Sequence, residues 1–96
     1  MVTTLRGKRY RIVSRYLGPK RRGLCSPPND KAKEILICSS MRSPESLLDT
    51  LLHEGLHSTL WDLDEAAVTA TATDLARLLI RVGVTLDPKE VHRRLK

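Results

Sequence analysis

Two histidines and a glutamate near the middle of the chain have the residue types and the spacing of a metal site. His53 and His57 lie four residues apart and Glu54 follows the first of them, so the segment reads H-E-x-x-H. On a helix, residues i and i+4 lie one above the other, and both imidazoles can reach a single ion. Glu54 is then placed to hold and deprotonate a water bound to that ion. The motif predicts a hydrolytic zinc site.

A catalytic zinc site takes three protein ligands and keeps its fourth position for water. Glu65 is the first choice for the third ligand, because it lies eight residues after His57 on the inward face of the next expected helix. Asp64 is the alternative, although a helix-capping role competes for it. Asp62 or a non-protein ligand are the remaining options. Zinc is the expected ion, and nickel, cobalt or manganese would fit the same ligands.

The chemistry expected from these residues is amide hydrolysis in a protein or peptide substrate. Zinc lowers the pKa of a bound water to about 7. Glu54 would accept a proton from that water and pass it to the leaving amine. A further donor should stabilise the oxyanion. Tyr10, Tyr16 and His92 are the candidates for this role, and the sequence leaves the choice among them open.

Two helices are expected to position the motif. The capping residue Ser43 and the proline after it predict a helix over residues 44–60, whose one polar stripe holds H-E-x-x-H. A second helix is expected over residues 64–82, with Gly83 as its stop. A short C-terminal helix should follow the capping residue Asp87. The inward stripe of the second helix is expected to consist of Glu65, Val68, Ala72, Leu75, Leu79 and Val82.

Short strands are expected ahead of the helices. Residues 8–17 alternate partly, with both tyrosines on one face, and residues 34–38 are a β-branched apolar run. Residues 24–25 begin a further short strand, which gives a sheet of about three strands. One α+β domain is expected over residues 1–96, made of a basic β-rich part (1–42), a metal-binding helix pair (43–82) and a C-terminal helix (83–96).

Charge is segregated along the chain. Residues 1–42 carry a net charge of +9, residues 43–76 carry −7, and residues 77–96 carry +4. The acidic middle segment favours a divalent cation. The basic segments admit an acidic partner, so the alternative function is a noncatalytic regulatory or nucleic-acid-binding module with a structural or vestigial metal site. Solvated surface is the simpler interpretation of these charges. The alternative would use Arg9, Arg11, Lys20, Arg21 and Arg22.

The two cysteines, Cys25 and Cys38, are too few for a disulfide framework. With the two histidines of the motif they could form a closed structural zinc site, but the usual C-x2-4-C half is missing. No signal-peptide-like run opens the sequence, and no stretch approaches the roughly 18 apolar residues of a membrane span. We expect a cytoplasmic protein with reduced thiols and no membrane contact.

Residues 43–57 together with residues 64–68 resemble the minimal zincin-like metallopeptidases, in particular small bacterial and phage proteins of the SprT-like and gluzincin type. The resemblance implies a small sheet ahead of the H-E-x-x-H helix and a following helix that carries a ligand. It also implies zinc, with Glu54 as general base and Glu65 in place of the gluzincin glutamate. The strand at residues 34–38 would align the substrate as an added strand.

The chain departs from larger relatives of this type in two respects. The gap between His57 and Glu65 is much shorter than in the larger gluzincins. The metzincin continuation is also absent, since Leu60 and Leu63 stand where its glycine and third histidine would be.

Overall fold

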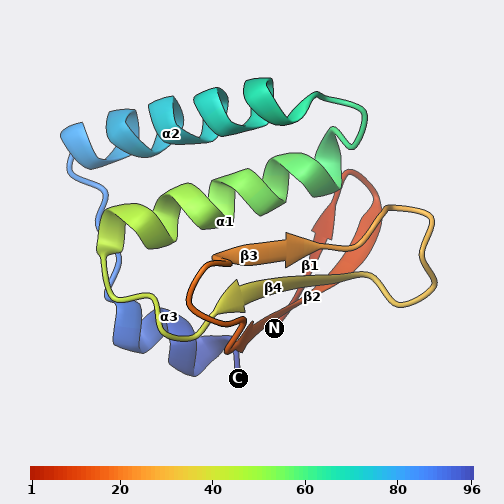
Figure 1. Ribbon diagram of the computed structural model, residues 1–96, viewed down its shortest axis with the longest axis horizontal. Coiled ribbons are helices and arrows are strands. Elements are labelled where there is room, and N and C mark those ends of the chain that lie inside the picture. The colour runs from red at the N-terminus through yellow and green to blue at the C-terminus, as the bar shows by residue number, and fades with distance from the viewer.

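A four-stranded sheet lies below two long helices in the computed structural model, which describes residues 1–96 (Figure 1). The fold is α+β, as predicted. None of the helices combines the length and the apolar character that a membrane crossing requires. The strands are β1 (Val2–Leu5), β2 (Lys8–Arg15), β3 (Gly23–Cys25) and β4 (Glu34–Cys38), and the helices are α1 (Pro44–Thr59), α2 (Glu65–Arg81) and α3 (Pro88–Arg94).

The strand order in the sheet is β1-β2-β4-β3. The β2–β4 pair is parallel, and the β1–β2 and β3–β4 pairs are antiparallel. The prediction of about three strands missed β1. Its turn into β2 consists of Arg6 and Gly7, both at positive φ (48° and 77°). Such a turn suits a two-residue hairpin, but Arg-Gly is not among the dipeptides that announce one.

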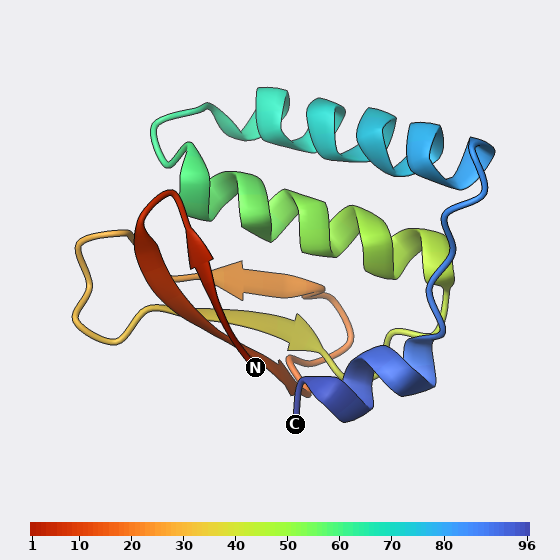
Figure 2. The same ribbon diagram turned by 180° about the vertical axis from the view of Figure 1, so that it is seen from behind.

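The interior position of β4 corrects one expectation. Residues 34–38 were expected to receive a substrate strand, but β4 is hydrogen-bonded to β2 on one side and to β3 on the other. A strand with both edges occupied cannot accept another. The free edges belong to β1 and β3, and β3 is the one that lies next to α1 in both views (Figures 1 and 2).

The core lies between the sheet and α1, and α3 covers one end of it. Tyr10 and Ile12 are buried there, but Tyr16, which was expected on the same face as Tyr10, is 62% exposed because β2 ends at Arg15. On α3, His92 is held on both sides: its Nδ1 lies 2.7 Å from Ser14 Oγ and its Nε2 lies 2.9 Å from the carbonyl oxygen of Met41. The buried members of the core are Tyr10, Ile12, Ile35, Ile37, Leu47 and Leu95.

Helix α2 packs on the side of α1 that faces away from the sheet, so α1 is the middle layer (Figure 2). The inward stripe of α2 is narrower than predicted. Val68, Ala72 and Ala76 are buried, whereas Glu65, Leu75 and Val82, which were expected on the inward stripe, are exposed. A helix that touches a single neighbour buries one narrow stripe, and small residues four apart let the two backbones approach closely. The stripe therefore follows the alanines and not the larger side chains.

Candidate metal centre

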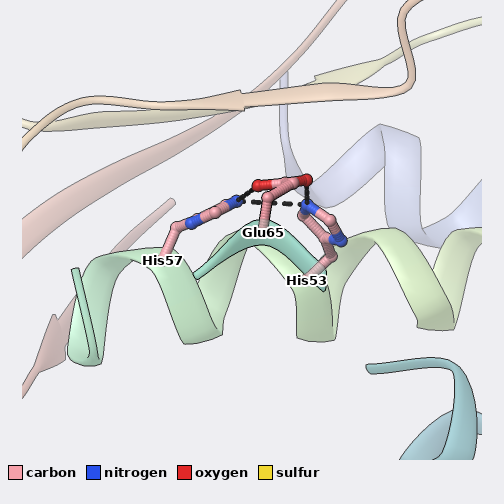
Figure 3. Close-up of side chains that lie close together, drawn as sticks. All are labelled: His53, His57 and Glu65. Atoms are coloured by element: carbon pink, nitrogen blue, oxygen red, sulfur yellow. Dashed lines mark hydrogen bonds and ion pairs between the residues drawn. The ribbon is translucent and has the colours of Figure 1, made fainter. Parts of the chain in front are cut away.

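The side chains of His53, His57 and Glu65 converge on one point, with the histidines on α1 and the glutamate at the start of α2 (Figure 3). The two histidine Nε2 atoms lie 3.1 Å apart. Glu65 Oε1 lies 3.0 Å from the Nε2 of His53, and Glu65 Oε2 lies 3.0 Å from the Nε2 of His57. Ligand atoms about 2.0–2.1 Å from a tetrahedral ion are separated by about 3.3 Å. The three side chains thus have nearly the spacing that an ion would require.

The start of α2 explains why Glu65, and not its neighbour, reaches the histidines. Asp64 is the N-cap, and its Oδ1 accepts a hydrogen bond of 2.7 Å from the backbone N–H of Ala67. This capping bond holds the Asp64 carboxylate on its own helix. The next side chain, Glu65, extends towards α1 and remains 68% exposed. The group His53, His57 and Glu65 is the ligand set chosen from the sequence, and Asp64 does not belong to it.

Glu54 has the environment of a functional carboxylate. It is only 6% exposed, and none of the ion pairs in the structure involves it. Burial raises the pKa of Glu54 from 4.5 to about 6, and the nearby carboxylate of Glu65 adds to this, while His53 and Arg21 act in the opposite direction. A buried acid with a raised pKa beside a ligand cluster is suited to proton transfer near neutral pH.

No protein-family model, curated protein or solved structure matches this chain. The assignment of a metal centre therefore rests on the three converging side chains and on the buried acid beside them. The likeness to zincin-like metallopeptidases stays an expectation from the motif.

The raised pKa of Glu54 predicts a pH-dependent stability. A folded-state pKa above the unfolded value means that stability falls as pH rises through this range and levels off above about 6. At pH 7.5 the ionised group costs the zinc-free protein about 2 kcal/mol. We therefore expect Glu54→Gln to stabilise the zinc-free protein by about that amount at pH 7.5, and by progressively less towards pH 4.5. Urea unfolding of both proteins at several pH values measures this, and equal stability at pH 7.5 would contradict it.

A close approach of β3 holds Glu54 in place. A Cβ atom at Gly23 would lie 2.6 Å from Glu54 Oε2, 3.0 Å from Glu54 Cγ and 3.0 Å from Thr50 Cγ2. Only a residue without a side chain allows the strand to lie this near to the helix. β3 therefore comes closest to Glu54 at Gly23.

Gly23→Ala is expected to destabilise the protein by about 1–3 kcal/mol, because the added methyl group must displace Glu54 or the strand. Gly55→Ala is the matched control, since a Cβ at Gly55 meets nothing within 4 Å. Alanine also favours the helix there, so this control should be neutral or stabilising by up to about 1 kcal/mol. Urea unfolding of both variants decides the matter, and a neutral Gly23→Ala would show that the contact is not tight.

Two hollows flank the polar stripe of α1. The first, of about 350 Å³, lies towards the N-terminal end of α1, and the second, of about 330 Å³, lies towards its C-terminal end. His53 and Glu54 line both of them. His53 and Glu54 thus lie where the two hollows meet, in an open cleft and not in a closed site.

None of the three residues expected to stabilise an oxyanion lines this cleft. Tyr10 is fully buried and its hydroxyl donates to the carbonyl of Ser26 at 3.2 Å. Tyr16 is exposed beyond the end of β2, and His92 is held under α3. Arg21, in contrast, lines both hollows, and its charge lowers the pKa of Glu54. From the sequence, Arg21 was expected to act only in the nucleic-acid alternative, because it stands in a basic run 32 residues before His53.

The cysteines do not join the histidines in a closed site. Cys38 is buried, and its Sγ lies 3.2 Å from Ser40 Oγ and 3.8 Å from the carbonyl oxygen of Gly18. Cys25 lines the second hollow, where burial and the nearby Glu54 raise its pKa to about 12. A thiol with so high a pKa stays protonated at neutral pH and is a poor ligand.

The five basic residues of the nucleic-acid alternative lie in two places. Arg9 and Arg11 are exposed on β2, on the face opposite to Tyr10 and Ile12, and Arg11 lies 3.9 Å from Glu34. Lys20, Arg21 and Arg22 precede β3 and line the cleft beside the metal ligands. The nucleic-acid alternative stays a prediction, and its two groups of basic residues would have to contact a nucleic acid separately.

Proposed function

We propose that the protein is a zinc-dependent peptidase in which His53, His57 and Glu65 hold the ion. The observation that supports this most directly is the convergence of their ligand atoms, all within 4.8 Å of one another, beside the buried carboxylate of Glu54. Aspartate-capped α2 and the histidine pair on α1 supply a set of two imidazoles and one carboxylate, which is a common set for catalytic zinc. As part of the same proposal the protein acts in the cytoplasm, since both thiols are free.

Zinc would supply Lewis acidity to the scissile carbonyl and to an attacking water. Residues of the chain carry out the proton transfers and stabilise the charge that develops. Glu54 takes the proton of the water and delivers it to the leaving amine nitrogen, and its raised pKa places both transfers near neutral pH. Arg21, at the junction of the two hollows, is positioned to stabilise negative charge on the carbonyl oxygen.

The free edge of β3 is suited to hold the substrate backbone. The carbonyl of Arg22 accepts from the N–H of Cys38, and the N–H of Ser26 donates to the carbonyl of Glu34. Backbone groups alternate in direction along a strand, so the N–H and C=O groups of Gly23 and Cys25 are directed to the free edge. A peptide paired there would lie beside Glu54, because Gly23 is in contact with that side chain.

Zinc content is the decisive experiment. We expect about one zinc per chain after equilibrium dialysis, and loss of that zinc in His53→Ala. His92→Gln is the matched control, because it removes the one imidazole outside the motif and should leave zinc bound. Absence of zinc in the wild-type protein at saturating concentration would refute the proposal. Equal zinc in the wild type and in His53→Ala would refute the assigned ligands.

A further inference from the structure

Three consecutive cations stand at one end of the cleft. Lys20, Arg21 and Arg22 line the first hollow together with His53 and Glu54. None of the three takes part in an ion pair. Unpaired cations gathered at a cleft raise the local concentration of anions. The arrangement thus differs from that of Arg93 and Arg94, which pair with Glu90 on the surface of α3.

The rest of this hollow is polar. Thr69 and Thr73 of α2 line it, and no apolar residue does. Two carboxylates line the hollow, Glu54 and Asp49. Asp49 accepts a hydrogen bond of 3.0 Å from Thr73 Oγ1. Asp49 is bonded to Thr73 of α2, so the three cations on the opposite side leave an excess of positive charge in the hollow, and the hydroxyl of Thr69 remains as an additional donor.

The second hollow has a different character. Leu24, Cys25 and Trp61 line it beyond His57, and Leu24 and Trp61 are 37% and 42% exposed. The cleft is therefore cationic on one side of the metal ligands and partly apolar on the other. A ligand that fills both hollows would carry its negative charge at the end that lies in the first hollow.

Strand direction decides which end of a peptide meets the cations. β3 runs from Gly23, beside the first hollow, to Cys25 in the second hollow. Antiparallel pairing is the commoner arrangement, and it would place the C-terminal half of a bound peptide at the cationic end. Strand residues advance about 3.4 Å each, and the first hollow begins at His53 and Glu54, so it receives the first or second residue after the scissile bond.

We propose that the cationic hollow is a carboxylate-recognition site and that the substrate carries a carboxylate one or two residues after the scissile bond. This inference rests on the proposed peptidase function. Two sources offer the same chemistry: an aspartate or glutamate side chain, or the C-terminal carboxylate of a short leaving fragment. A nucleic-acid phosphate would be a competing occupant of the same cations, and the test below separates it.

The test compares matched peptides on the zinc-loaded, full-length protein. One pair is amidated at its C-terminus and differs only by aspartate or asparagine in the two positions after the cleaved bond. A second pair has neutral side chains and ends in a free acid or an amide. We expect about a tenfold higher kcat/KM for the acidic member of at least one pair, the size of a charge-assisted hydrogen bond in a partly exposed site. The pair that shows the preference identifies the source of the carboxylate.

Two double variants test whether Lys20 and Arg22 cause the preference for a carboxylate. Lys20→Gln/Arg22→Gln should reduce the preference to about twofold or less, and Arg21 is left intact because it adjoins the reacting atoms. Arg9→Gln/Arg11→Gln removes the same charge on the opposite face of the sheet and should keep the full preference. Fluorescence anisotropy of the labelled peptides on zinc-loaded Glu54→Gln gives the same comparison without turnover, with a single-stranded oligonucleotide of equal charge as a third ligand.

The outcomes separate the two proposals. Cleavage of acidic and neutral peptides at equal rates, or equal loss of the preference in both double variants, would overturn the carboxylate site and leave the peptidase intact. Preferential binding of acidic peptides without cleavage of any peptide would support the site and refute the peptidase. Tighter binding of the oligonucleotide than of either acidic peptide, lost in Lys20→Gln/Arg22→Gln, would overturn the inference in favour of a phosphate ligand.

Discussion

Glu54→Gln is expected to lower kcat for peptide hydrolysis by about 10²–10⁴-fold while zinc content stays at the wild-type value. Glutamine has the size and shape of glutamate but cannot accept a proton, so the substitution removes the general base alone. The side chain is buried against Gly23 and Thr50, and an isosteric replacement fits the same space. Single-turnover kinetics and zinc analysis on the same preparation measure the two quantities.

A matched control distinguishes the loss of the base from a loss of charge. Glu45→Gln makes the same chemical change in the exposed first turn of α1, two and a half turns before the motif. It should change kcat by less than about twofold, because surface charges far from a site contribute little. Hydrolysis that persisted in Glu54→Gln at more than a tenth of the wild-type rate would mean that another group takes the proton.

The central part of the site was predictable because it depends on local rules. The spacing of His53 and His57 fixes their common face on any helix, and the helix itself is announced by Ser43 and Pro44. Glu65 was predictable for a related reason: it lies three residues before Val68 on the side of α2 that faces α1, and the capping residue before it was already engaged. The positions of His53, His57 and Glu65 on their helices do not depend on how the sheet is assembled.

The substrate side of the site was not predictable, because it depends on contacts between distant segments. Nothing local indicates that Gly23 touches Glu54, or that β3 and not β4 is the edge strand beside α1. The place of Arg21 in the cleft was unpredictable for the same reason, since it depends on β3 lying next to α1. Strand order is set by long-range pairing and by the hairpin at Arg6, and neither follows from periodicity.

The narrow contact between α1 and α2 also has a consequence for stability. Glu65 is tied to the histidines at the start of α2, and further along the helix the buried contacts are Val68, Ala72 and Ala76. Alanines bury little apolar area, so each contributes little to holding the two helices together. An ion that binds ligands from both helices would therefore contribute a large share of the stability of this pair.

Zinc is for this reason expected to raise the thermal midpoint of unfolding by about 10–20 °C when its free concentration is a hundredfold above the dissociation constant. At that ratio a ligand that binds only the folded chain stabilises it by about 2.7 kcal/mol. For a domain of this size each kcal/mol corresponds to about 4–8 °C. Differential scanning calorimetry of the metal-free protein, with and without zinc, measures the shift.

The shift should depend on the ligands and on pH in a defined way. His57→Ala and Glu65→Ala each remove one ligand and should reduce the shift to a few degrees. Asp64→Asn preserves the helix cap and all three ligands, so it should show the full shift. Histidine must be neutral to bind a metal ion, so the shift should also diminish as pH falls. A zinc-induced shift of full size in Glu65→Ala would mean that α2 does not contribute a ligand. The ion would then not join the two helices, and their contact would depend on the small buried side chains alone.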